Sequence, residues 1–101
     1  MEHGKKGSVN IMENDKFMKK CKEIVVDYFN SQADSTDKNG KITKDDTFIV
    51  WAVKTLQNNK ALASTKVSDG MYYELTYNGD KKEIYVDAYK KCKNFVVKVE
   101  E

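Results

Sequence analysis

Residues 71–91, MYYELTYNGDKKEIYVDAYKK, decide the fold, because they predict two β-strands joined by one tight turn. Apolar and polar residues alternate on both sides of the segment NGDK, whose residue types are typical of hairpin turns. We pair Tyr77 with Lys82 across this turn. A turn on the Asn-Gly pair alone would place Glu74 opposite Glu83, and like charges in that position destabilise a sheet. The predicted register gives one apolar face, made up of Met71, Tyr73, Leu75, Ile84, Val86 and Ala88.

The other face of this hairpin is polar but rich in tyrosine. It carries Tyr72, Glu74, Tyr85, Asp87 and Tyr89. A solvated sheet face needs only threonines and charges, whereas tyrosine supplies a rigid contact area with a polar end and is enriched at interfaces. We interpret these five residues as a partner-binding face. The competing interpretation is that the tyrosines cover the sheet edge or that the C-terminal segment packs over them. In the first case Tyr85→Ala weakens binding, and Val86→Ala on the apolar face weakens the fold.

The chain before the hairpin predicts a tail and one helix. Residues 1–12 contain two glycines and no periodic pattern, which is typical of a flexible tail, and residues 13–101 are expected to form a single domain. From residue 13 to residue 32 the apolar side chains recur at helical spacing. This stripe consists of Phe17, Cys21, Ile24, Val25, Tyr28 and Phe29. Asn14 is expected to cap the helix, and Cys21 to be buried and slow to react.

The polar linker after the helix has the spacing of a calcium-binding loop. With Gly40 at position six, Asp37 and Asn39 occupy positions three and five, where calcium needs oxygen ligands. However, position one is Ser35 and position twelve is Asp46, where such loops use aspartate and the longer glutamate. We therefore predict an ordinary turn, with no metal site and no cofactor.

Residues 47–57, TFIVWAVKTLQ, are β-branched and aromatic, and we predict a buried strand. A helix is the alternative, because residues 43–46 match a capping box and the apolar residues also fit helical spacing. The Asn58-Asn59 pair favours the strand, since a two-residue turn there pairs Leu56 with Ala61. This arrangement lines one face with small residues that let the helix approach closely: Ala52, Ala61 and Ala63.

The alternation changes phase after Tyr89. Residues 90–93 are mostly basic, and apolar residues then alternate again at Phe95, Val97 and Val99. We expect a bend followed by a short final strand. The order of elements predicts an α+β fold, in which one N-terminal amphipathic helix packs on a four-stranded antiparallel meander, similar in outline to the cystatin-like arrangement.

The composition disfavours several classes of function. Eighteen basic residues, all lysine, nearly balance sixteen acidic ones, so no strong field attracts nucleic acid or anionic lipid. Lysine lacks the planar fork with which arginine reads guanine or phosphate, which disfavours sequence-specific DNA recognition. No apolar run approaches a membrane span and no signal-peptide pattern occurs, so we expect a cytoplasmic protein. The two cysteines, Cys21 and Cys92, have no CxxC partner and are expected to fill the core as reduced thiols.

Catalytic patterns are not found in the sequence. The only histidine, His3, lies in the predicted tail, far from either cysteine in the chain. No phosphate-binding loop, dinucleotide-binding loop or zinc-protease motif occurs. We therefore expect that the protein is not an enzyme.

The segments KTLQNNKALAST, SDGMYYELTYNGDKKEIY and VDAYKK resemble a family of small uncharacterised proteins of tailed phages and prophages from low-GC Gram-positive bacteria. The resemblance covers residues 17–94 and supplies no catalytic residue. It implies an intracellular accessory protein of an infected or lysogenic host. We expect a non-enzymatic module that binds a host or phage protein, with inhibition of a host or defence protein as one form of this role. The alternative is a nucleic-acid-associated protein that uses exposed tyrosines, helix lysines, and Lys90, Lys91 and Lys93.

Overall fold

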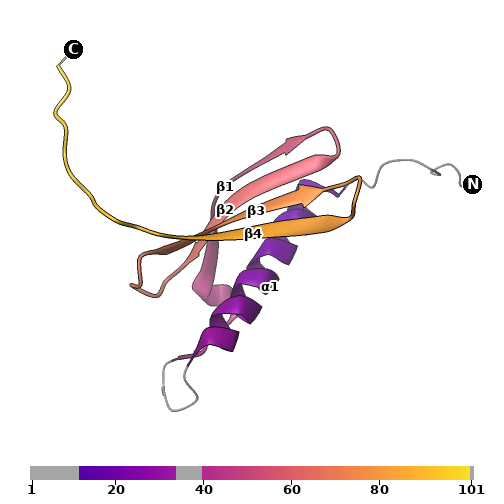
Figure 1. The fold of residues 1–101 in the computed structure, drawn as a ribbon, viewed down its shortest axis with the longest axis horizontal. Coiled ribbons are helices and arrows are strands. Elements are labelled where there is room, and N and C mark those ends of the chain that lie inside the picture. Colours follow the sequence, from indigo (N-terminus) through magenta and orange to yellow (C-terminus); the bar gives the residue numbers. More distant parts are fainter. Residues whose placement is uncertain (1–11, 34–39, 101) are drawn as a thin grey trace, which may run out of the picture.

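A computed structural model describes residues 12–33 and 40–100. The elements are helix α1 (Asn14–Gln32), the 3-10 turn η1 (Lys44–Asp46), and strands β1 (Thr47–Thr55), β2 (Asn58–Thr65), β3 (Met71–Asn78) and β4 (Glu83–Lys90). The strands form one antiparallel sheet in the order β1-β2-β3-β4, and α1 crosses one of its faces (Figure 1). This confirms the predicted α+β fold, one N-terminal helix on an open four-stranded antiparallel sheet.

Helix α1 buries the first part of the predicted stripe. Phe17, Cys21 and Val25 are fully buried, as their spacing of four residues requires on one helix face. The stripe leaves the sheet at Tyr28, which is 42% exposed. Even there, the Tyr28 ring meets the Tyr73 ring edge-on, with centroids 6.0 Å apart.

The start of α1 differs from the prediction. The N-cap residue is Glu13, and Asn14 is the first helical residue. The Asn14 side chain does not cap the helix, because its Oδ1 accepts a hydrogen bond from Asn59 Nδ2 of β2 at 3.4 Å. Met12, assigned to the tail from the sequence, packs against the core; the rest of the predicted tail lies outside the described residues.

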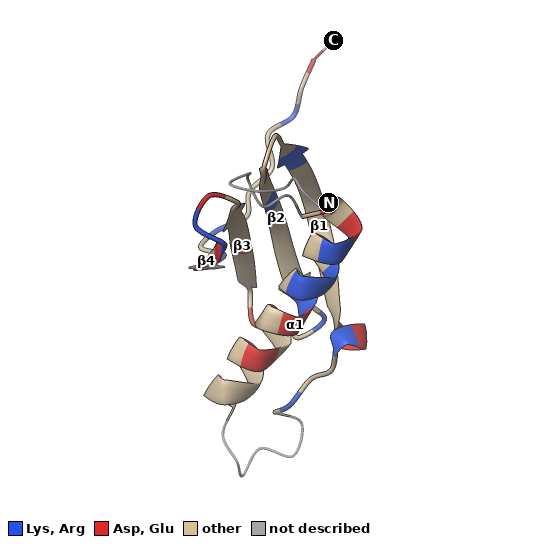
Figure 2. Cartoon of the chain, turned by 90° about the vertical axis from the view of Figure 1, so that its right-hand side faces the viewer, with Lys and Arg blue, Asp and Glu red and all other residues tan. Residues whose placement is uncertain are grey.

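Small residues lie where the helix crosses the sheet. Ala61 and Ala63 of β2 are fully buried in one cluster with Phe17, Tyr73 and Leu75. This confirms that β2 presents small residues to α1. In contrast to these buried alanines of β2, helix α1 carries many charged residues (Figure 2).

Strand β1 confirms the strand prediction for residues 47–55 and also contains the predicted capping box. Thr43 donates its backbone N–H to Asp46 Oδ2 at 2.8 Å, but the box closes only the single turn η1. A β-bulge between Ile49 and Trp51 then inserts one extra residue, Val50. Ile49 consequently packs against the core, while Val50 is 45% exposed.

The turn between β1 and β2 lies two residues earlier than predicted. Thr55 pairs with Asn58, so the turn is formed by Leu56 and Gln57, with Leu56 at φ 54°. The prediction was wrong because the two asparagines begin β2. From Trp51 onward the register changes by an even number of residues, so the predicted faces are retained there, with Ala52 opposite Ala61. Before the bulge the change is odd, which brings Ile49 onto the core face.

The hairpin β3–β4 also has a wider loop than predicted. Tyr77 pairs with Ile84, not with Lys82, and Asn78 pairs with Glu83. Asn78 Oδ1 accepts hydrogen bonds from the backbone N–H groups of the following loop, at 2.9 and 3.3 Å, which stabilises the wider turn. The shift is again even, so every residue keeps its predicted face.

The apolar side of β4 is less buried than the sequence suggested. Helix α1 packs on β1, β2 and β3, and β4 is almost entirely exposed. Val86, expected in the core, is 41% exposed, and Ala88 is also exposed. The predicted loss of stability in Val86→Ala is therefore wrong as a core effect, because the helix does not cover this strand.

Residues 91–100, hereafter the C-terminal arm, form no strand, which contradicts the predicted short final strand. The Lys91 N–H donates to Gly70 O at 2.7 Å, after which the arm extends away from the sheet (Figure 1). Cys92 is exposed, so only Cys21 fills the core as predicted. Neither cysteine forms a disulfide.

The two thiols should react at very different rates. Burial raises the pKa of Cys21 to about 12, so almost no thiolate forms at neutral pH and reagents have no access. We expect one thiol, Cys92, to react rapidly with a chromogenic disulfide reagent in native conditions, and both to react in denaturant. In Cys92→Ser, rapid native labelling should disappear; labelling that persists would show that Cys21 is accessible.

Candidate protein-binding face

The sheet face opposite α1, hereafter the open face, consists of three cross-strand rows. The rows are Phe48 with Ser64, Tyr72 and Tyr89; Trp51 with Leu62, Glu74 and Asp87; and Val53 with Lys60, Thr76 and Tyr85. Side chains of alternate residues share a face, so these residues point away from the buried Tyr73 and Leu75. No helix or strand of the described residues covers them.

All five residues predicted for partner binding lie on the open face. Tyr72 pairs with Tyr89, and Glu74 pairs with Asp87. Tyr85 and Tyr89 are 42% and 52% exposed, whereas Tyr72 lies deeper between its neighbours. The C-terminal arm does not pack over them, which contradicts that form of the competing interpretation.

Hydrogen bonds hold the two exposed tyrosines in place. Tyr89 donates its hydroxyl to Glu74 Oε1 at 3.2 Å, and Lys60 Nζ lies 3.3 Å from Glu74 Oε2. Tyr85 donates to Glu83 Oε1 at 2.8 Å. These bonds to carboxylates raise the pKa of both phenols, because they stabilise the protonated form, and they orient each hydroxyl as a donor. A preoriented aromatic side chain loses less conformational entropy when a partner binds.

The sequence interpretation missed the half of this face that β1 contributes. Residues 47–57 were predicted to be buried, but β1 is an edge strand with one open side. Phe48, Trp51 and Val53 are 43%, 41% and 52% exposed. The bulge at Val50 breaks the alternation of the strand, so that apolar residues follow one another without a visible period. The signal for this half of the face was the unusual number of large apolar residues.

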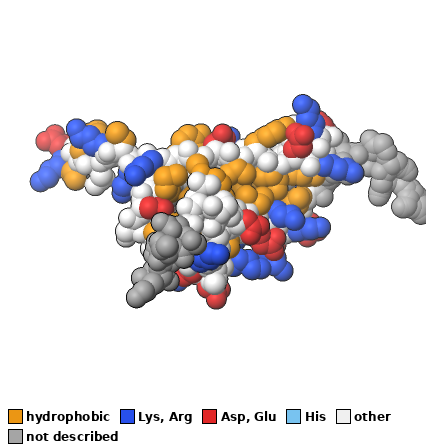
Figure 3. All heavy atoms as spheres, turned by 60° about the horizontal axis from the view of Figure 1, so that its bottom comes forward, with side chains coloured by type: hydrophobic (Ala, Val, Ile, Leu, Met, Phe, Trp, Pro, Cys, Tyr) orange, Lys and Arg blue, Asp and Glu red, His pale blue; other side chains and the backbone are white. Residues whose placement is uncertain are grey.

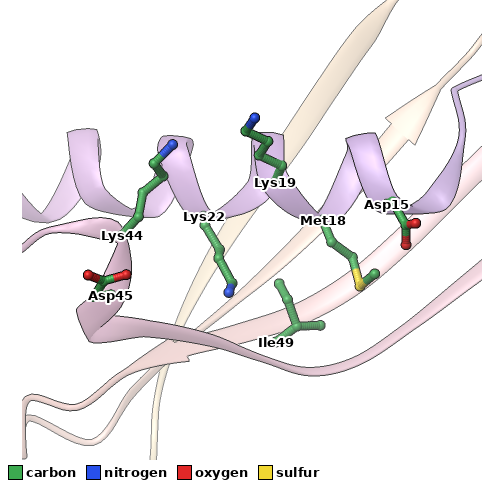
Figure 4. A pocket seen from close by; sticks show the side chains of 7 residues that line it. All are labelled: Asp15, Met18, Lys19, Lys22, Lys44, Asp45 and Ile49. Atoms are coloured by element: carbon green, nitrogen blue, oxygen red, sulfur yellow. The ribbon is translucent and has the colours of Figure 1, made fainter.

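A groove lies between α1 and β1, apart from the open face (Figure 4). Met18 and Lys22 point toward Ile49 in this groove, which has a volume of about 530 Å³. Two more lysines and two carboxylates border it: Lys19, Lys44, Asp15 and Asp45. Cations and anions are mixed around the groove, and Lys44 already pairs with Glu23 at 3.6 Å, so the groove has no strong preference for an ion of either sign.

The calcium-loop spacing gains no support from the described part of the chain. Ser35, Asp37 and Asn39 lie outside the described residues. Asp46 Oδ2 accepts hydrogen bonds from the Thr43 backbone and hydroxyl at 2.8 and 3.3 Å. Among residues 12–33 and 40–100 there is no group of three or more metal-ligating side chains, and no helix long and apolar enough to cross a membrane.

Comparison of the sequence with known protein families identifies one match. The model of a family of unknown function (DUF6275) matches residues 18–99. The match includes most of α1, all four strands and nearly the whole C-terminal arm. No curated protein and no solved structure matches the chain.

Proposed function

The chain belongs to the DUF6275 family, a family of unknown function, and from the geometry of its open face we propose that it is a non-enzymatic module that binds another protein. One observation carries this proposal. Large apolar and aromatic side chains border both edges of a sheet face that α1 leaves uncovered. Exposed groups of large apolar and aromatic side chains are characteristic of interaction sites.

The composition of the open face fits a protein partner. Aromatic side chains with a polar end are the residues that most often dominate protein interfaces. Trp51 and Tyr85 are 41% and 42% exposed at opposite edges of the face. A partner with an apolar patch would complement this face.

The charge pattern disfavours the alternative, nucleic-acid binding. Three carboxylates lie on or beside the tyrosines of β4: Glu74, Glu83 and Asp87. They would repel a phosphate backbone. The lysines of α1 lie in the other layer of the fold (Figure 2), and those of the C-terminal arm lie beyond the end of β4. Neither group forms a basic track past the exposed tyrosines.

The resemblance to phage proteins extends the proposal to a biological role. A small phage-encoded protein with a binding face and no catalytic group acts by occupying its target. We therefore place it in the cytoplasm of an infected or lysogenic bacterium, where it binds a host or phage protein. Blocking a host or defence protein would be the direct consequence of such binding.

The proposal is tested with Tyr85→Ala, which removes an exposed aromatic side chain from the open face. We expect partner affinity to fall by about 30-fold, because interface tyrosines of this kind contribute about 2 kcal/mol. The free energy of unfolding should change by less than about 1 kcal/mol. The partner is first isolated by affinity capture from a host lysate, and its dissociation constant is then measured by calorimetry for the wild type and the variant.

Tyr28→Ala is the matched control, since Tyr28 is also 42% exposed but lies on α1. It should leave partner affinity unchanged. Equal affinity of Tyr85→Ala and the wild type, or a loss of folding in Tyr85→Ala, would contradict the proposed face. Raising salt from 50 to 200 mM separates the alternatives, because binding through many phosphates would weaken by about 10³-fold or more.

A further inference from the structure

The C-terminal arm combines strand-forming residues with full exposure. Phe95 and Val97 are each 71% exposed, and Val96 and Val99 are each 81% exposed. Figure 3 shows the arm projecting from the body with hydrophobic and lysine side chains along it. β-Branched and aromatic residues favour a strand, yet the arm pairs with no strand among residues 12–33 and 40–100. The family match extends to residue 99, so the arm belongs to the region that the family shares.

The sheet offers a matching unfilled edge at β4. Lys91 donates its backbone N–H to Gly70 O, on the β3 side of β4. The backbone N–H and C=O groups of every second residue before it, Tyr89, Asp87 and Tyr85, therefore also point toward β3. Because the direction of backbone bonding alternates along a strand, the intervening residues present their N–H and C=O groups to the open edge. These are Ile84, Val86, Ala88 and Lys90. This edge has no bulge and no proline, whereas the other edge of the sheet is interrupted at Val50.

The arm does not fill this edge in its own chain. It leaves β4 in the direction of that strand and continues past the end of the sheet (Figure 1). To pair with its own β4 it would have to reverse direction immediately. Residues 90–93, KKCK, include none of the residues that favour a tight reverse turn.

We propose that the arm pairs with β4 of a second copy of this chain, in a symmetric exchange that gives a dimer. A two-fold axis perpendicular to the sheet makes the two copies of β4 antiparallel. Since each arm continues its own β4, it then runs antiparallel to the β4 of the other copy. The second copy is the chemically matched occupant, because it brings one unpaired arm and one unpaired edge.

Side-chain complementarity selects the register. With the axis at Lys90, Lys93 of one copy lies opposite Asp87 of the other, and Phe95 lies opposite Tyr85. Opposite charges and aromatic pairs in these positions stabilise a sheet. An axis one residue later would instead place Lys93 opposite Tyr89 and Phe95 opposite Asp87, which loses both the charge pair and the aromatic pair. The chosen register brings together the two Lys90 side chains, whose long stems diverge into solvent.

This inference goes beyond the proposed function, because it concerns a different partner. The dimer would join two open faces into one continuous surface, with Tyr85 near the seam. Loss of the dimer and loss of partner binding are measured separately, by mass in solution and by calorimetry.

The first experiment measures the mass of the full chain in solution by sedimentation velocity, from about 1 to 100 μM, a range that covers moderate interface affinities. We expect a dimer that dissociates on dilution. Val97→Asp should weaken it by about 100-fold, because it places a charge on the paired arm. Removal of residues 94–101 should give a monomer that still unfolds in one cooperative transition, with a midpoint that no longer depends on protein concentration. Val67→Asp is the matched control: Val67 is 37% exposed in the β2–β3 loop, and this variant should still dimerise.

The second experiment tests the register by charge reversal. Asp87→Lys and Lys93→Asp should each weaken the dimer, since each creates two like-charge pairs. An equimolar mixture of the two variants should recover it, because both pairs in the mixed dimer are opposite in charge. A wild type that stays monomeric at the highest concentration, or a dimer unaffected by Val97→Asp and by truncation, would overturn the proposal. A mixture no tighter than the single variants would overturn the pairing of Asp87 with Lys93.

Discussion

Phe17→Ala is expected to lower the free energy of unfolding by about 4 kcal/mol. Phe17 is fully buried between α1 and the sheet, in the cluster that includes Cys21 and Leu75. Truncation removes most of a large apolar side chain from the core and leaves a cavity that neighbouring residues fill only in part. A domain of this size has a total stability of roughly 5–15 kcal/mol, so the variant should be close to unfolding at 37 °C. Urea unfolding followed by circular dichroism measures the change.

Phe48→Ala is the control for this prediction, since it makes the same change on the open face. Phe48 is 43% exposed, so its truncation should cost about 1 kcal/mol and create no closed cavity. Similar losses in the two variants would mean that α1 does not bury Phe17 against the sheet.

Ala61→Leu is expected to destabilise the protein by about 3 kcal/mol through overpacking of the core. This mechanism is the opposite of that in Phe17→Ala, which leaves a cavity. Ala61 is fully buried on β2, where α1 crosses the sheet. A leucine there would force the helix away from the sheet or push neighbouring side chains out of their preferred rotamers. Thermal unfolding in parallel with the wild type should show a clearly lower midpoint.

Ala88→Leu tests whether the helix is the cause. Ala88 lies on the same face of the sheet, opposite Tyr73, but on β4 and exposed. The larger side chain has open space there, so stability should change by less than about 1 kcal/mol. A large loss in Ala88→Leu, or none in Ala61→Leu, would contradict the position of the helix over β2.

The faces of the elements could be predicted from the sequence, because they depend on periodicity alone. The helical spacing of Phe17, Cys21 and Val25 identified the buried side of α1, and alternation in β3 separated Tyr73 from Tyr72. The β3–β4 register, and the β1–β2 register beyond Val50, were wrong by an even number of residues, which moves cross-strand partners without turning a side chain to the other face. Only the residues of β1 before the bulge changed face. The fold class and the tyrosine face therefore did not depend on the register.

The positions of the turns could not be predicted, because asparagine occurs both in tight turns and at strand positions where its side chain forms hydrogen bonds. Asn-Gly and Asn-Asn pairs suggest tight turns. In the folded chain, Asn78 instead ends β3 and binds the loop with its side chain, and Asn59 is buried within β2 next to Asn14. These roles depend on tertiary contacts that the local sequence does not contain.

The candidate face was predicted only on its β3–β4 side for a similar reason. A single inserted residue at Val50 shifts the period of β1, so Trp51 and Val53 could not be separated from core residues by alternation. The coverage of β4 also depends on where α1 crosses the sheet, and no local pattern specifies this. The exposure of Val86 follows from that placement.

The bulge in β1 also limits how far the sheet can polymerise. A sheet with two straight edges has a valence of two, and copies of it can add on both sides without end, as in fibrils. Val50 distorts the β1 edge of this sheet, so only the β4 edge can pair with another copy, which is a valence of one. Pairing through β4 with two-fold symmetry uses that single valence and closes the assembly. One additional residue in an outer strand thus separates a finite complex from an open-ended fibre.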